Sequence, residues 1–292
     1  MIASITVCGR APANGPEPEK PSVCRLYTFR STTPRKVECE LICSQNSLFA
    51  QSRQDARGES NPDGWGLGTY DRGIPHVVRQ AEAAYESDAF RWEAARVETC
   101  NVMAHVRRAT VGSLRVENTH PFSDGQWMMA HNGHIGGFEA VKPRLLARLS
   151  DERRGSIRGS TDSEHIFYLL LTLHDEDPLS PLTSIMRSGV RRIIQWSREE
   201  TDGSEVALNL VLSTGRETVG LRFGRTLWSV ERDLVHSCEV CDGLVHLSES
   251  PSGYRAVAVA SEPVTSDEDW REIPEETLYR IGPDNLLVTE SL

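Results

Sequence analysis

Four short stretches of the sequence carry residues that can do chemistry at places where packing does not call for them. They are Cys24, "HVRRATVG" (105–112), "HNG" (131–133) and "TDSE" (161–164). A cysteine thiolate is a nucleophile and a metal ligand, an arginine binds carboxylates through a planar fork, and amide N–H groups stabilise developing negative charge. Taken singly, each has an ordinary interpretation: a hairpin turn for Asn-Gly, a salt bridge for Arg107, and a helix start for Asp162.

The elements that would position these stretches form a run of strands, then helices, then strands again. Alternating apolar residues predict strands, and apolar residues at helical spacing predict helices. Strands are predicted over 24–30, 63–71, 74–82, 100–110, 126–135, 206–214, 218–224, 244–249 and 255–264. Helices are predicted over 37–52, 88–97, 138–149, 161–175 and 182–197, with Thr161 as the N-cap of the fourth. This order indicates two sheets packed face to face with helices outside, in one domain over residues 24–292.

The composition and charge exclude several classes of function. The chain has 292 residues and a formal net charge of -10, so its surface would repel phosphate backbones and no nucleic-acid partner is expected. The best membrane candidate, residues 166–173, is too short to cross a bilayer, so no membrane association is expected. Because no export signal is found, the protein is expected to be cytoplasmic, with its seven cysteines reduced.

Together and in this order, the four stretches resemble class II glutamine amidotransferases, a family of N-terminal-nucleophile hydrolases. "CRL" opens the domain, and "NPDGWGLG", "HVRRAT", "NTHPF", "HNG", "TDSE" and "VASEP" follow. The resemblance covers residues 24–263 and is strongest to the stand-alone branch, which includes the γ-glutamyl hydrolase of ergothioneine synthesis. It implies an α+β fold, a four-layer αββα sandwich of two antiparallel sheets flanked by helices. No cofactor is expected.

The resemblance implies that Cys24 attacks an amide carbonyl and forms a thioester, with its own α-amino group as the general base. Asn132, through its side-chain amide, and Gly133, through its backbone N–H, would form the oxyanion hole. A free α-amino group requires Cys24 to be the first residue, so residues 1–23, which are rich in proline, are expected to be a disordered leader. Either the leader is cleaved off, or translation starts at Val23 and the leader is never made; we favour the second route.

The substrate pocket that the resemblance implies contains Arg107 for the substrate carboxylate, Asp162 for its ammonium group, and Thr110. Arg108 and Val111 stand where synthase-fused relatives often have an aromatic residue and a histidine, which puts free glutamine in doubt as the substrate. The expected function is hydrolysis of the γ-carboxamide of glutamine or of a γ-glutamyl conjugate. Two alternatives remain open: a glutaminase subunit that donates ammonia to a separate synthase partner chain, and a catalytically silent binding module.

Two further features lie outside this pattern. Cys238 and Cys241 form a C-x-x-C with His236 nearby, which is the pattern of a redox pair or of half a zinc site. A closed zinc site needs about four ligands, and the only other close pair, Cys39 and Cys43, has the i, i+4 spacing of one helix face, so no metal is predicted. The acidic segment 266–276 is interpreted as a solvated surface stretch.

Overall fold

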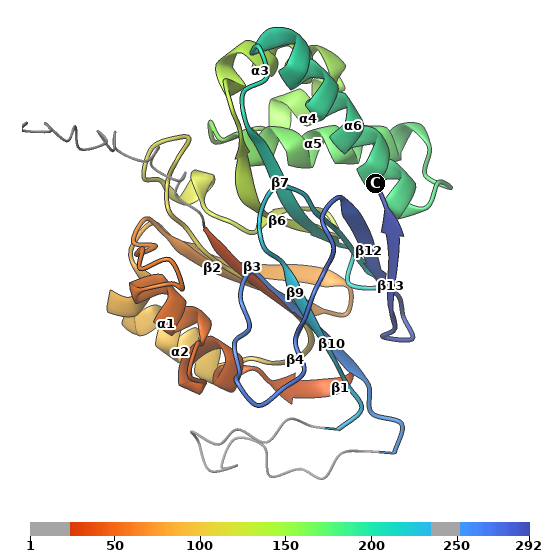
Figure 1. Cartoon of the computed structure of the whole chain (residues 1–292). Helices are drawn as coiled ribbons and strands as arrows, with labels where there is room; N and C mark the ends of the chain where they lie inside the picture. The colour runs from red at the N-terminus through yellow and green to blue at the C-terminus, as the bar shows by residue number, and fades with distance from the viewer. Residues whose placement is uncertain (1–23, 235–251) are drawn as a thin grey trace, which may run out of the picture.

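The computed structural model describes residues 24–234 and 252–292. Within these residues, two antiparallel sheets lie face to face, and helices cover the outer face of each sheet (Figure 1). The layers are therefore helix, sheet, sheet, helix, and the predicted αββα sandwich is confirmed. No helix in the described part of the chain is long and apolar enough to cross a membrane.

The first sheet has seven strands, and β1 lies in its middle. In spatial order they are β11 (Arg271–Glu272), β9 (Trp228–Arg232), β10 (Ala256–Ala260), β1 (Arg25–Lys36), β4 (Glu98–Val106), β2 (Trp65–Asp71) and β3 (Ile74–Gln80). Side chains alternate between the two faces of a strand. Leu26 of β1 faces the second sheet, whereas Tyr27 and Phe29 face the covering helices. Cys24 is two residues before Leu26, so its side chain falls on the face between the sheets.

The second sheet has six strands. In spatial order they are β13 (Leu287–Ser291), β12 (Thr277–Ile281), β8 (Thr218–Arg222), β7 (Val206–Ser213), β6 (Trp127–Ile135) and β5 (Phe122–Asp124). β7 is buried on both faces because the first sheet covers one side and helices the other, which explains its nearly continuous apolar sequence. Met103, Met128 and Tyr279 are fully buried in the core between the two sheets.

Helices cover each sheet from outside. A π-helix (Cys39–Cys43), α1 (Leu48–Arg53), a 3-10 helix (Ala84–Glu86) and α2 (Asp88–Arg96) lie with the first sheet. The second sheet carries α3 (Phe138–Arg148), α4 (Asp151–Ser156), α5 (Asp162–Glu176) and α6 (Leu182–Glu200), and a 3-10 helix (Val116–Asn118) lies between β4 and β5.

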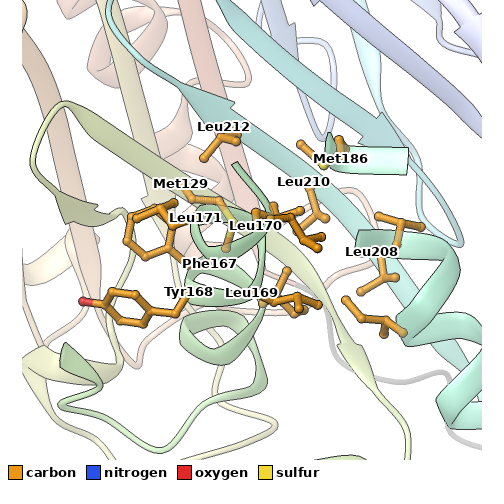
Figure 2. Close-up of a cluster of buried hydrophobic side chains, with 14 of the residues drawn as sticks. Met129, Phe167, Tyr168, Leu169, Leu170, Leu171, Met186, Leu208, Leu210 and Leu212 are labelled. Atoms are coloured by element: carbon orange, nitrogen blue, oxygen red, sulfur yellow. The ribbon is translucent and has the colours of Figure 1, made fainter. Parts of the chain in front are cut away.

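α5 is apolar around most of its circumference because it is packed between the second sheet and the helices beside it. Figure 2 shows Phe167 and Leu170 of this helix against Met129 and Leu210 of the sheet. The predicted cap is confirmed, since the Thr161 hydroxyl accepts a hydrogen bond from the Glu164 N–H at 3.3 Å. The cap fixes where α5 begins and therefore where Asp162 lies.

Two sequence predictions need correction. The single helix predicted over 37–52 is two short helices, because Ser47 caps a new one by accepting from the Ala50 N–H at 3.3 Å. The segment 266–276 is not a fully solvated stretch. Trp270 and Ile273 are buried in it, and Glu268 forms an ion pair with Arg232 at 2.6 Å.

Candidate active site

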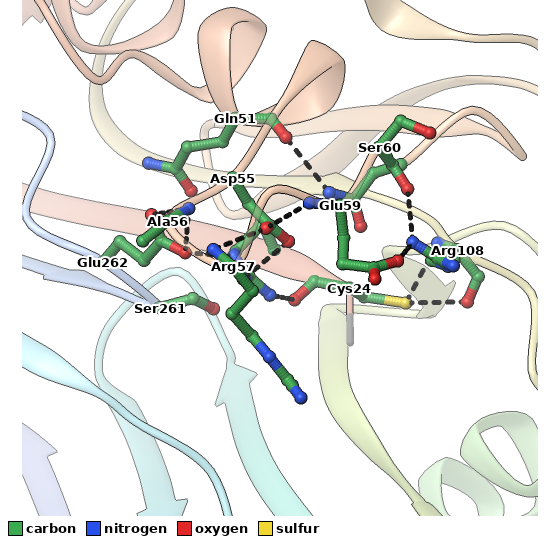
Figure 3. Close-up of polar contacts among 12 residues, drawn as sticks. Cys24, Gln51, Asp55, Ala56, Arg57, Glu59, Ser60, Arg108, Ser261 and Glu262 are labelled. Carbon is green, nitrogen blue, oxygen red and sulfur yellow. Dashed lines mark hydrogen bonds and ion pairs between the residues drawn. The ribbon is translucent and has the colours of Figure 1, made fainter. Parts of the chain in front are cut away.

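Cys24 lies at the start of β1, beside the segment that follows β4. The pairing of Arg25 with Val106 places Arg108 next to the thiol. The Arg108 N–H donates to Sγ at 3.3 Å, and the thiol donates to the Arg108 carbonyl at 3.3 Å (Figure 3). Burial raises the pKa of the Cys24 thiol, although the Arg108 N–H and the charge of Arg107 act in the opposite direction. The thiol is therefore protonated at neutral pH, and a base is needed to make the nucleophile.

Arg25 holds the backbone of the cysteine from the other face of the sheet. Its Nη1 donates to the Cys24 carbonyl at 3.0 Å. The same guanidinium pairs with Asp55 at 2.6 Å and with Glu262 at 2.7 Å, and all three side chains are at least nine-tenths buried. Figure 3 shows Glu262 also receiving the backbone N–H of Ala56. A buried cation that is paired in this way can hold the nucleophile's carbonyl in one position.

Asn132 and Gly133 lie inside a strand and not at a hairpin turn. Both belong to β6, where they pair with Asn209 and Leu208 of β7. A Cβ atom at position 133 would lie 2.0 Å from the carbonyl oxygen of Ala207, so only glycine fits there. The ordinary interpretation of the Asn-Gly pair is therefore wrong, and the glycine is explained by the close approach of β7.

Asn132 of the second sheet is connected to β1 of the first sheet by hydrogen bonds through Ser261. Its Nδ2 lies 2.9 Å from Ser261 Oγ. Ser261 follows β10 and faces Leu26 of β1: the Leu26 N–H donates to Ser261 Oγ at 3.0 Å, and the Ser261 N–H donates to the Leu26 carbonyl at 3.0 Å. This chain of contacts brings the predicted oxyanion residue to the strand that carries Cys24.

Arg107 is buried, and its guanidinium organises the loop that follows it. Nη2 donates to the carbonyls of Val111 at 2.9 Å and Gly112 at 3.3 Å, and Nη1 donates to that of Ser113 at 3.3 Å. Burial lowers the pKa of Arg107, and the charge of nearby Asp162 opposes that effect. These are not the contacts of a surface arginine.

Thr110 belongs to this same loop and, unlike the buried Arg107, it is exposed. The loop starts at Ala109, whose N–H donates to Asp63 at 2.7 Å.

Asp162 is the first residue of α5, and it joins this helix to β6. Its Oδ2 accepts the Ile135 N–H at 2.8 Å, and its Oδ1 accepts the Ser163 N–H at 2.8 Å. His131 makes a second connection: its Nε2 lies 3.0 Å from the Ala207 carbonyl, so Nε2 must carry the proton, and Nδ1 accepts from the Ser163 hydroxyl at 2.9 Å. The hydrogen bonds of His131 and Ile135, which flank Asn132 and Gly133 in the chain, therefore fix the position of this segment.

Of the six predicted site residues, Cys24 interacts electrostatically with Arg107 and Asp162 across the gap between the sheets. Asn132, next to Gly133 in β6, reaches β1 through Ser261, and Thr110 is exposed. Sequence reasoning did not single out Ser261, although it lies in the "VASEP" stretch, and it gave no role to Arg25 of "CRL".

The C-x-x-C of Cys238 and Cys241, with His236, lies outside the described residues. Over 24–234 and 252–292, no cluster of three or more histidine, cysteine or acidic side chains could hold a metal ion.

Two solved structures share this fold. The structure of a glutamine aminotransferase class-II domain protein from Silicibacter pomeroyi aligns with a TM-score of 0.63 and 23% identity, covering 92% of this chain and 98% of that one. Glutamine phosphoribosylpyrophosphate amidotransferase from B. subtilis aligns with a TM-score of 0.60 and 17% identity over 92% of this chain and 49% of that one. The arrangement of sheets and helices is therefore the fold of these two structures.

Sequence relatives point the same way. A probable glutamine amidotransferase of Saccharomyces cerevisiae is 28% identical over 302 residues, covering 91% of this chain and 84% of that protein. The gamma-glutamyl-hercynylcysteine sulfoxide hydrolase of Mycobacterium tuberculosis is 26% identical over 238 residues, covering 81% and 82%. The family model "Glutamine amidotransferases class-II" matches residues 24–290. The chain therefore belongs to the class II glutamine amidotransferases.

Proposed function

We propose that this enzyme hydrolyses the γ-amide of a γ-glutamyl conjugate or of glutamine through a thioester on Cys24. The family and its γ-glutamyl hydrolase relatives support amide hydrolysis. The observation that supports the assignment most directly is that the half-buried Cys24 thiol interacts electrostatically with the buried Arg107 and Asp162, while Asn132 reaches the strand that carries Cys24 through Ser261.

The reaction follows from the chemistry of these groups. The α-amino group of Cys24 takes the thiol proton as Sγ attacks the γ-carbonyl, and the oxygen that becomes negative accepts hydrogen bonds from Asn132 and Gly133. The C–N bond then breaks, and the departing amine or ammonia takes the proton. Water, activated by the same α-amino group, cleaves the thioester and releases the γ-carboxylate product.

This mechanism requires a chain that begins at Cys24, so we also propose that residues 1–23 are absent from the active enzyme. The base and the nucleophile are then one residue, and an acylated α-nitrogen cannot accept a proton. Removal of a leader produces this chain, and so does translation from Val23 once the initiating methionine is trimmed.

We assign substrate recognition to Arg107 and Asp162. A γ-glutamyl group carries one α-carboxylate and one α-ammonium group, and these two buried side chains offer the complementary charges. The mycobacterial relative is named for a γ-glutamyl conjugate, which supports a conjugate as the substrate here. The yeast relative is named as a probable glutamine amidotransferase, which keeps ammonia donation to a separate synthase as the second candidate.

The test compares a chain that begins at Cys24 with the full-length chain on a panel of γ-glutamyl amides that includes glutamine. We expect turnover only from the chain that begins at Cys24, and a covalent γ-glutamyl adduct on Cys24 by mass spectrometry after rapid quenching. Cys24→Ala should abolish turnover without unfolding the protein, whereas Cys100→Ala, at the far end of β4, should not change it.

Two results would contradict this proposal. One is full activity from the chain that keeps residues 1–23, and the other is near-normal activity of Cys24→Ala. The panel also separates the two candidate functions: a kcat/KM for a conjugate well above that for glutamine favours the hydrolase, and the reverse order favours ammonia donation.

A further inference from the structure

We propose that Ser261 is a positioning residue for the oxyanion hole. Its hydroxyl donates a hydrogen bond to Oδ1 of Asn132 and thereby turns the Asn132 amide N–H groups toward the reacting carbonyl. The inference rests on the proposed function, because it assumes that Asn132 stabilises an oxyanion, and it assigns to Ser261 the control of which atom of Asn132 faces the substrate.

The hydrogen bonds around Asn132 carry this inference. Both side chains are 1% exposed. With Nδ2 facing Ser261 at 2.9 Å, Asn132 Oδ1 is buried with no partner within the described residues. Ser261 Oγ then accepts two hydrogens, one from Asn132 and one from the Leu26 N–H. For its own proton, the part of the chain that the structure describes offers no acceptor. A buried acceptor and a buried donor are therefore left unsatisfied at the same time.

A half-turn of the Asn132 carboxamide removes both defects, because the oxygen and nitrogen of an amide have nearly the same shape. The Ser261 hydroxyl then donates to Oδ1 and still accepts from Leu26. The two N–H groups of Nδ2 enter the buried space where Oδ1 had no partner. An oxyanion that forms there in the transition state is the acceptor these N–H groups need.

The backbone fixes the position of this hydroxyl relative to the nucleophile. Leu26 and Ser261 exchange two hydrogen bonds of 3.0 Å, and Leu26 is two residues from Cys24 on the same face of β1. On the other side, the Ser261 carbonyl accepts the Thr226 hydroxyl at 3.1 Å. One serine therefore connects the strand that carries the thiol to the amide that would stabilise the oxyanion.

Single and double variants of a chain that begins at Cys24 test the proposal. Asn132→Ala should lower kcat by about 10²–10³-fold, the usual cost of losing one oxyanion donor. Ser261→Ala should lower kcat by about tenfold, with KM changed by less than about twofold, because the orientation of the amide affects the transition state more than substrate binding. The double variant should be no slower than Asn132→Ala alone, because the serine acts through the asparagine.

Thr226→Val is the matched control, since it removes a hydroxyl that bonds to Ser261 but does not touch Asn132. Its kcat should stay within about twofold of the parent chain. If the two single losses multiply in the double variant, Ser261 acts through Leu26 and the nucleophile strand, and the proposal is overturned. Unchanged kcat in Ser261→Ala would overturn it as well.

A second measurement does not depend on activity. A neutron structure shows which atom of Asn132 faces Ser261, because it locates hydrogen atoms directly. Oδ1 facing a Ser261 O–H donor supports the positioning role, and Nδ2 facing Ser261 refutes it. This outcome stays informative even if no γ-glutamyl amide is turned over, so failure of the proposed function and failure of this inference can be told apart.

Discussion

Replacing Arg25 with methionine would remove the cation from a buried cluster and leave two carboxylates without their partner. In the native protein, Arg25 pairs with Asp55 at 2.6 Å and Glu262 at 2.7 Å, and the three side chains are 4%, 1% and 9% exposed. Removing one partner of a buried ion pair costs about 3–5 kcal/mol, because the remaining charge is neither hydrated nor paired. Asp55 and Glu262 keep backbone N–H donors from Arg57 and Ala56, so we expect a loss of about 3 kcal/mol.

Thermal and urea unfolding measure this loss, with Arg271→Met as the control. Arg271 pairs with Asp269 at 2.8 Å, a similar distance, but the two side chains are 79% and 80% exposed. Exposed pairs of this kind contribute little to stability, because water screens both charges. At about 2–4 °C per kcal/mol, Arg25→Met should lower Tm by roughly 6–12 °C and Arg271→Met by only a few degrees.

The triple variant Arg25→Met, Asp55→Asn, Glu262→Gln separates charge from packing. The amide side chains keep an oxygen that accepts the same backbone N–H groups, but they carry no charge. We therefore expect the triple variant to be more stable than Arg25→Met alone. The electrostatic reasoning fails if Arg25→Met loses no more stability than Arg271→Met, or if the two additional substitutions destabilise it further.

Two further outcomes follow from the described geometry. Gly133→Ala should abolish turnover and destabilise the protein by about 1–3 kcal/mol or more, because its Cβ would lie 2.0 Å from the Ala207 carbonyl. Gly155→Ala should be neutral or stabilising, because its Cβ would meet no atom within 4 Å. Measurements of Tm and kcat would contradict this reasoning if the two variants behaved alike. Burial lowers the pKa of His105 to about 3 and that of His120 well below its ordinary value. Both histidines therefore stay neutral in the folded protein, whereas the unfolded chain takes up protons on them below about pH 6.5. As the pH falls below that value, each histidine lowers the free energy of unfolding by up to about 1.4 kcal/mol per pH unit. Urea unfolding of the parent chain at about pH 7 and about pH 5 should show this loss of stability. The loss should be smaller in His120→Leu and unchanged in the control His76→Gln, whose side chain is exposed. Equal losses in the parent chain and both variants would exclude these histidines as the cause.

Elements with a local signal could be predicted from the sequence, and elements held by distant contacts could not. α5 has an apolar run and a capping threonine, so its start could be predicted to the residue. α4 buries none of its residues, and its start is capped by the Ser150 hydroxyl, so no apolar periodicity announces it. β9 and β12 are short, and their strand character depends on partners elsewhere in the chain.

The same distinction applies to the site. Cys24, Asn132 and Asp162 could be proposed as site residues because they lie in short motifs whose order along the chain is characteristic. The contact between Leu26 and Ser261 joins residues 235 positions apart, and it exists only because β10 pairs with β1. Arg25 meets Glu262 for the same reason, and it meets Asp55 because the segment after α1 packs against the start of β1. Sequence spacing alone carries no information about which strands become neighbours, so these contacts could not be predicted from it.

The thiol and Arg107 are attached to one sheet, whereas Asn132, Gly133 and Asp162 are attached to the other sheet or to the helix packed on it. The proposed nucleophile and the proposed oxyanion donors therefore lie on different layers, and the large side chains between the layers set their separation. Met103, Met128 and Tyr279 are fully buried between the layers, and their close-packed volume limits how near the two sheets can approach each other. A change in their volume would therefore be expected to move the proposed nucleophile relative to the proposed oxyanion donors.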